Sequence, residues 1–111
     1  MHMNFSIELS NTETIPGKTI NAFHGIVSGS TVRAKHLGRD IMAGFKNIVG
    51  GELKGYTELL EESRLEAVKR MVDQAQSVGA NAVVNVRFTT SSVTAGASEF
   101  YVYGTAVTVE G

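Results

Sequence analysis

Apolar and polar residues alternate at the start of the chain, where Phe5, Ile7 and Leu9 are separated by serine and glutamate. Alternation with a period of two is typical of a β-strand that buries one face. The segment ETIPGK follows and contains the only proline of the chain beside a glycine, which predicts a turn. We therefore expect an N-terminal strand within residues 1–11 and then a turn. Met1, His2 and Met3 could include a cloning remnant.

A second strand is predicted over residues 19–31, because both sets of alternating positions are apolar or small. One face would carry Ile20, Ala22, His24 and Ile26, and the other Phe23, Gly25 and Val27. A strand that is buried on both faces shows this pattern.

Helical spacing begins after Asp40, a residue suited to the N-cap position. Ile41, Met42, Phe45 and Ile48 follow at intervals that predict a short helix ending at Gly50-Gly51. Each of these glycines costs a helix about 1 kcal/mol relative to alanine, so we expect a break in the helix axis there.

A long amphipathic helix is predicted from Glu52 to about Val78, with Gly79 as its C-terminal stop. Its apolar stripe comprises Tyr56, Leu60, Ser63, Ala67, Met71, Ala75 and Val78, widened by Leu53, Val68 and Val72. Acidic residues crowd its first half and basic residues come later, which suits the helix dipole.

Two further strands follow the helix. In the first, Val84, Val86 and Phe88 are predicted to face one way, and Val83, Asn85 and Arg87 the other. Residues 91–98 (SSVTAGAS) read as a flexible connection to a strand over residues 100–109, so a hairpin is expected. The predicted fold class is α+β with two layers: a mainly antiparallel sheet packed against one long helix, preceded by a short helix. A single domain over residues 1–111 suits this length.

Charge and composition exclude several classes of binding partner and site. The net charge is −1, with ten basic and eleven acidic side chains, so no global field attracts nucleic acid or a membrane surface. Cysteine is absent, which excludes disulfides and thiolate metal ligands. No apolar run approaches the 18 or more residues of a membrane span. We expect a cytoplasmic protein that binds neither nucleic acid nor membrane.

Several spaced blocks resemble the YbjQ family, also labelled UPF0145 or putative heavy-metal-binding. They are Arg39-Asp40, Ala43, Ile48-Val49-Gly50-Gly51, Tyr56, Arg64, Ala67, Gly79-Ala80-Asn81-Ala82-Val83 and Gly104-Thr105-Ala106-Val107. The resemblance spans residues 12 to 109. It implies a dodecin-like α+β subunit assembled into a homo-oligomer, a pentameric ring, and gives Asp40, Gly50, Gly51, Tyr56, Gly79 and Gly104 a structural role. It implies no established activity.

One departure from the family pattern concerns the strand after the long helix. Many relatives carry acidic residues there, whereas this chain has Asn85, Arg87 and Thr89. An arginine side chain has no acceptor and cannot ligate a cation. If those carboxylates bind metal in relatives, this chain has replaced them.

His24 is the candidate metal ligand, with a divalent ion as the cofactor it suggests. The alternative is a core or interface histidine whose nitrogens are hydrogen-bonded. In a ring, one histidine repeated about the axis could form a site that a single chain does not show.

A basic loop offers a candidate anion site: Arg33, Lys35, His36 and Arg39 gather just before the predicted N-terminus of the short helix. The alternatives are a solvated loop, or pairing of Arg39 and Asp40 with a neighbouring subunit. Gly50-Gly51 lacks the lysine and hydroxyl residue of a phosphate-binding loop, so a helix break explains it better.

Aromatic stacking and catalysis are the remaining chemistries. Tyr56, Tyr101 and Tyr103 could stack on a planar ligand, although packing is the more frequent use of tyrosine at such positions. No nucleophile elbow or Ser, His and Asp set suggests a triad, and we predict no enzyme. Two hypotheses remain: a homo-oligomeric protein that binds a metal ion or small anion at subunit interfaces, or a structural or protein-interaction ring without a ligand.

Overall fold

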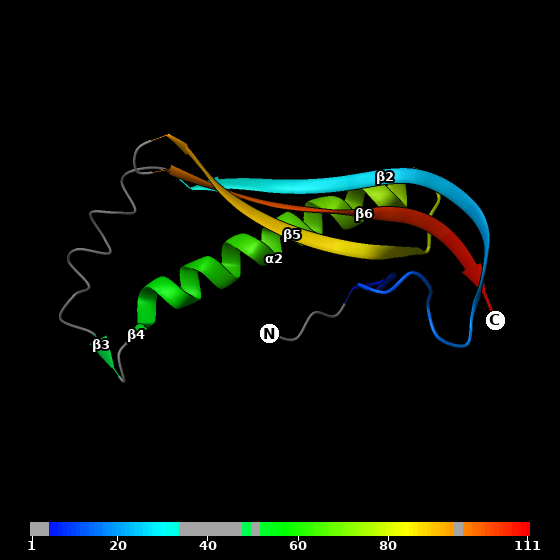
Figure 1. Ribbon diagram of the computed structural model, residues 1–111, viewed down its shortest axis with the longest axis horizontal. Coiled ribbons are helices and arrows are strands. Elements are labelled where there is room, and N and C mark those ends of the chain that lie inside the picture. The colour runs from blue at the N-terminus through cyan, green and yellow to red at the C-terminus, as the bar shows by residue number, and fades with distance from the viewer. Residues whose placement is uncertain (1–4, 34–47, 50–51, 95–96) are drawn as a thin grey trace.

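The helix α2 (Lys54–Ser77) packs on one face of a four-stranded sheet (Figure 1). The computed structural model describes residues 5–33, 48–49, 52–94 and 97–111. Its elements are β1 (Glu8–Leu9), β2 (Thr19–Arg33), β3 (Ile48–Val49), β4 (Glu52–Leu53), α2 (Lys54–Ser77), β5 (Ala82–Thr94) and β6 (Ala97–Glu110). The sheet order is β1-β5-β6-β2; β1 is parallel to β5 and the other pairings are antiparallel. The predicted α+β class is confirmed, while the dodecin-like class stays a prediction.

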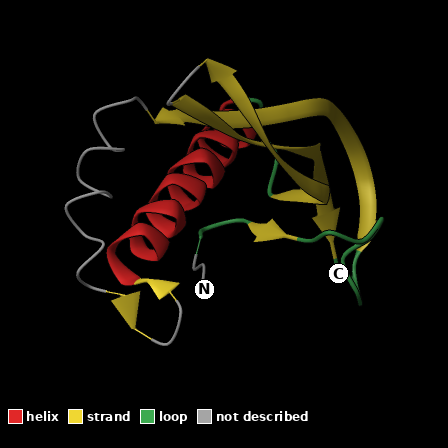
Figure 2. Ribbon diagram, turned by 60° about the vertical axis from the view of Figure 1, so that its left-hand side comes forward, coloured by secondary structure: helices red, strands yellow, loops and turns green. Residues whose placement is uncertain are grey.

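The helix α2 matches the predicted long helix closely, because its apolar stripe packs against a single face of the sheet. Ser63, Ala67, Val68, Met71, Val72 and Ala75 are all buried. They pack against Val27, Val83, Val86, Val102 and Ala106 of the sheet. Figure 2 shows the helix along this face, which we call the inner face. Val78, placed on the stripe by the spacing, is 45% exposed because the helix ends one residue earlier.

The helix ends in a Schellman motif. The Ala80 amide donates to the Ala75 carbonyl at 3.1 Å, and the Gly79 amide donates to the Gln76 carbonyl at 3.1 Å. Gly79 has φ +85°, a conformation that strains residues with a Cβ. The prediction that Gly79 stops the helix is confirmed.

We expect Gly79→Ala to lower the free energy of unfolding by about 1–2 kcal/mol, the usual cost of the left-handed conformation. Gly79→Asn is the control and should cost less, because asparagine tolerates this conformation. Urea denaturation at one fixed protein concentration measures both. Equal stabilities of the alanine and wild-type proteins would contradict this account of the helix end.

A bulge in β5 changes which valines face the helix. Asn85 has φ +55°, and the register shifts between Val84 and Arg87. Val83 and Val86 therefore both join the inner core, whereas Val84 lies on the opposite, outer face. The predicted strict alternation was wrong here, because one extra residue inverts the pleat.

Gly104 lies opposite this bulge and allows the strands to approach closely. A Cβ at this position would lie 2.6 Å from Val83 Cγ1 and 3.0 Å from the Val84 carbonyl oxygen. The structural role implied for Gly104 thus has a steric basis in this fold.

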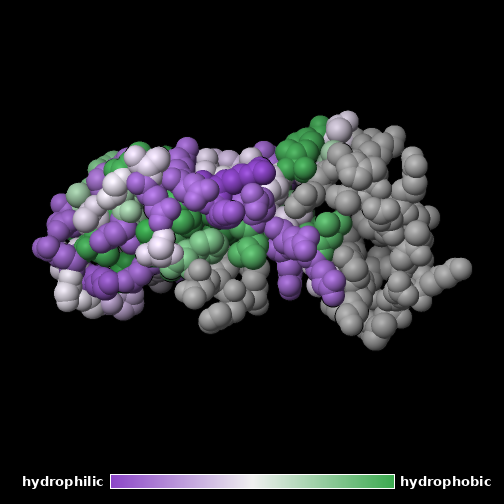
Figure 3. Space-filling view, turned by 180° about the vertical axis from the view of Figure 1, so that it is seen from behind, coloured by the Kyte–Doolittle hydropathy of each residue, from purple (hydrophilic) through white to green (hydrophobic). Residues whose placement is uncertain are grey.

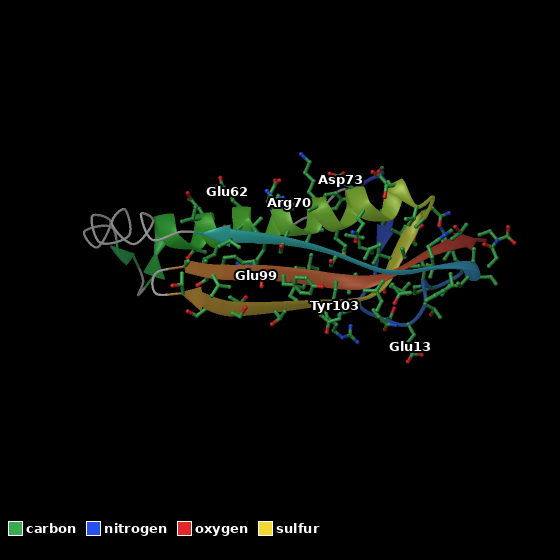
Figure 4. All side chains as sticks on the ribbon, turned by 90° about the horizontal axis from the view of Figure 1, so that it is seen from above. Glu13, Glu62, Arg70, Asp73, Glu99 and Tyr103 are labelled. Carbon is green, nitrogen blue, oxygen red and sulfur yellow. The ribbon has the colours of Figure 1, made fainter. Side chains whose placement is uncertain are left out.

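A second, smaller core covers part of the outer face. Ile15 comes from the segment between β1 and β2 and packs on Ala82, Val84, Val107 and Val109. Figure 4 shows Glu13 of this segment projecting from the face opposite the helix. The segment covers the outer face near the end of β6, but it leaves the side chains of Phe23 and Ile26 exposed.

Three sequence predictions need correction. The strand β2 is not buried on both faces, since it is an edge strand and Phe23 and Ile26 are strongly exposed. Ile48 lies in β3 and Glu52–Leu53 in β4, an antiparallel pair in place of the helix residues expected there. A glycine pair between two short runs favours such a hairpin. The expected flexible connection over 91–98 is largely strand, because β5 reaches Thr94 and β6 begins at Ala97.

Candidate functional site

An apolar ridge stands on the outer face along β2. The β2 ridge consists of Ile20, Phe23 and Ile26, which pair in register with Val109, Val107 and Thr105 of β6. Phe23 is 74% and Ile26 78% exposed. Large apolar side chains this exposed and this close together mark interaction sites on soluble proteins.

The strand that carries the ridge forms one edge of the sheet. Among the described residues, no strand pairs with β2 along the edge that faces away from β6. Natural edge strands are commonly protected by charged side chains or proline. Residues 19–32 contain no Asp, Glu, Lys, Arg or Pro. Residues 19–32 themselves therefore place no charged side chain on this edge, which suits contact with another protein surface.

Two side chains from α2 occupy part of that edge. The Ser28 amide donates to Gln74 Oε1 at 2.7 Å, and Arg70 Nη1 donates to the Ser30 carbonyl at 2.6 Å. Arg70 also lies 3.5 Å from Glu66 Oε1. The middle of β2 thus has hydrogen-bond partners already, and a further strand could pair there only by displacing them.

His24, the candidate metal ligand, is an exposed residue at a bulge in β2. The register passes from Phe23 to Gly25 across it, and its Nε2 lies 2.7 Å from Thr108 Oγ1. Within the described part of the chain, no three His, Cys, Asp or Glu side chains are grouped to hold a metal ion. A metal site at His24 would therefore need donors from outside the described residues or from another subunit.

Most of the predicted anion site falls outside the described residues. Lys35, His36, Arg39 and Asp40 lie there, as do Gly50 and Gly51. Arg33 is the last residue of β2 and pairs in register with Ser98. Tyr56 lies in the first turns of α2. The anion site stays a prediction.

The tyrosines of β6 form an aromatic pair on the outer face. The ring centroids of Tyr101 and Tyr103 are 5.7 Å apart with planes tilted by 33°. Tyr103 is 40% exposed and points away from the helix (Figure 4). These two rings pack on each other, and Tyr103 keeps an accessible surface beside Arg87, its register partner on β5.

Residues 85–87 of β5 hold the N-terminal segment in place. The Asn85 amide donates to the Thr12 carbonyl at 2.9 Å, and Arg87 Nη1 donates to the Asn11 carbonyl at 2.8 Å. The Val86 amide donates to the Ser10 carbonyl at 3.0 Å. In this chain β5 therefore anchors the N-terminal segment through two backbone amides and the side chain of Arg87.

An open apolar groove lies at the other edge of the sheet. It has a volume of about 230 Å³ and is lined by Leu9, Ser10, Asn11, Val68, Val86 and Phe88. Phe88 is 49% exposed and pairs with Val102, so it lies on the inner face, the same side as the helix. Figure 3 views this side, where hydrophobic patches appear between hydrophilic residues. Sequence reasoning missed the groove because three distant segments form it.

No helix in the described ranges combines the length and the apolar character needed to cross a membrane.

The described residues define a small α+β fold in which α2 packs on a four-stranded sheet, with accessible apolar surfaces at the β2 ridge and at the groove. A family model described as "Putative heavy-metal-binding" matches residues 7–110. The chain belongs to this family, YbjQ, as the resemblance predicted.

Sequence relatives agree with this assignment, and one solved structure agrees with the fold. A UPF0145 protein from Hahella chejuensis is 67% identical over 92% of this chain and 98% of its own length. Another, from Archaeoglobus fulgidus, is 55% identical over 95% and 97%. The crystal structure of a protein of unknown function from Pediococcus pentosaceus, of the DUF74 family, matches with a TM-score of 0.62. It covers 94% of this chain and 98% of its own at 12% identity, so it supports the fold alone.

Proposed function

We propose that this chain is a subunit of a homo-oligomeric binding protein, which assembles through the β2 ridge and holds a small ligand where subunits meet. The exposure of Phe23 and Ile26 on an edge strand that has no charged side chain over residues 19–32 carries this proposal. Burying each of these side chains fully is worth about 1.5–3 kcal/mol relative to leaving it in water. A neighbouring subunit supplies that burial.

The ligand is a divalent metal ion or a small anion. The metal is favoured by the family description, and His24 lies between Phe23 and Ile26 on the assembling strand. Assembly would bring copies of this single donor near a common interface, and metal sites need several converging donors. The anion is favoured by a basic cluster that starts with the last residue of the same strand and comprises Arg33, Lys35, His36 and Arg39. The family resemblance implies five subunits.

Native mass spectrometry of the purified chain, kept free of chelators, tests assembly and ligand together. We expect a single homo-oligomer that retains additional mass from a metal ion or anion. An oligomer without retained mass, together with no saturable binding of divalent metals or simple anions below about millimolar Kd, would contradict the ligand part. It would favour the non-catalytic structural or protein-interaction ring.

We expect the double variant Phe23→Ser, Ile26→Ser to shift the protein to monomer in size-exclusion chromatography with light scattering. The substitutions remove most of the apolar surface that association would bury, while both side chains are already exposed in the subunit. Circular dichroism should stay unchanged. Val78→Ser is the matched control, since Val78 is a 45% exposed apolar residue at the helix end. An oligomer that survives the double variant would exclude the β2 ridge as the assembly surface.

A further inference from the structure

The β2 ridge and the apolar groove occupy opposite edges and opposite faces of the same sheet. The ridge lies on the outer face at the β2 edge, since Ile26 pairs through Thr105 with Val84 of the outer core. The groove lies on the inner face at the β1–β5 edge, between Val68 of the helix and Phe88. Both surfaces are apolar and accessible in one subunit.

We propose that the ridge of one subunit docks into the groove of the next, so that Phe23 or Ile26 packs among Leu9, Val68, Val86 and Phe88 of a second copy. This inference deepens the proposed function and rests on it. The two sheets then overlap. The outer face of one subunit at its β2 edge lies on the inner face of the next subunit at its β1–β5 edge. The contact is heterologous, because it joins two different patches, and repetition of such a contact closes into a ring when the rotation permits.

Charge and size favour a second copy as the occupant of the groove. The ridge strand has no charged residue over 19–32, and the β5 strand beside the groove has none over 88–94. Interface cores are depleted of charge in this way. A groove of about 230 Å³ has room for one large apolar side chain, and the ridge supplies two strongly exposed ones.

Two observations favour an overlap of the two sheets over the addition of a neighbour's strand to the β2 edge: the surface area that an interface needs, and the hydrogen bonds already made along β2. A specific interface takes about 800 Å² from each partner, or about 20–30 residues, more than the three residues of the ridge provide. The rest of the uncharged segment 19–32 supplies it, together with residues 88–94 of β5, which have no strand on their outer edge among the described residues. Gln74 and Arg70 already bond the Ser28 amide and the Ser30 carbonyl, which opposes a new strand pairing along the middle of β2.

Cysteine cross-linking tests the pairing, because the chain has no cysteine of its own. Ile26→Cys marks the ridge and Phe88→Cys marks the groove, each as a single variant with its assembly verified by light scattering. The two variants are co-refolded in equal amounts and treated with a short bis-maleimide. We expect cross-linked dimers in the mixture at about tenfold or more over either variant alone, the signature of a heterologous contact.

The double variant Ile26→Cys, Phe88→Cys should give a ladder of covalent multimers that ends at the size of the oligomer. Phe23→Cys replaces Ile26→Cys where the latter disturbs assembly. Dimers of Ile26→Cys alone would mean that ridges pack on each other, and would overturn the head-to-tail contact while leaving the oligomer in place. An intact oligomer with no cross-link would overturn it too, and would leave the groove to a different occupant. A monomeric wild-type protein would instead reject the proposed function itself.

Discussion

Gly29→Ala is expected to destabilise the subunit by at least about 4 kcal/mol, beyond the ordinary range of single substitutions. A Cβ at Gly29 would lie 2.1 Å from the Ala67 carbonyl oxygen and 2.5 Å from the Met71 amide nitrogen. Both atoms belong to the backbone of α2, so no change of side-chain rotamer relieves the clash. The helix must move away from β2, and the surrounding core loses its packing.

Urea denaturation at a fixed protein concentration measures this loss, because association makes apparent stability depend on concentration. Ser30→Ala is the matched control on the next residue of β2. Ser30 pairs in register with Tyr101, and its side chain lies on the outer face, away from the helix. The substitution should therefore change the free energy of unfolding by no more than about 0.5 kcal/mol. A Gly29→Ala protein with nearly wild-type stability would contradict the close contact between α2 and β2.

Met71→Ala is expected to lower the free energy of unfolding by about 2–5 kcal/mol, the cost of a large-to-small change in a packed core. Met71 has no solvent-exposed surface and is one of the largest fully buried side chains among the described residues. Its cluster joins α2 to β2, β5 and β6, so the cavity lies between the two layers.

Met71→Leu is the control for this prediction, because it keeps the volume and should cost less than about 1.5 kcal/mol. Thermal or urea unfolding of the three proteins gives the comparison. If alanine and leucine cost the same, the side chain does not fill the interlayer core in the way described.

The elements with a clear period could be predicted from the sequence. The helix stripe from Ser63 to Ala75 is buried as its spacing indicated, and the hairpin of β5 and β6 forms as expected. Local periodicity sufficed there, because one face of each element meets a single apolar layer. The helix stop at Gly79 followed from glycine's freedom at positive φ.

Features that depend on contacts between distant segments could not be predicted. The bulge at Asn85 is invisible to a period of two, although an asparagine in a run of valines is a weak signal for a left-handed residue. The exposure of Phe23 depends on where the segment around Ile15 stops covering the sheet. Only tertiary structure decides such coverage, so β2 was interpreted as buried.

The candidate site was predicted in part. Sequence reasoning selected His24 as a metal ligand or an interface histidine, and the structure places it exposed on an edge strand. The groove combines Leu9, Val68 and Phe88, residues that no local pattern brings together. The anion prediction at Lys35, His36 and Arg39 lies outside the described residues.

The mass of the native wild-type protein in solution tests the central claim most directly. Native mass spectrometry at micromolar concentration should show one closed homo-oligomer, an integer multiple of the 11.9 kDa chain, and the Phe23→Ser, Ile26→Ser protein should appear at 11.9 kDa. A wild-type protein that is monomeric under these conditions would contradict assembly through the β2 ridge.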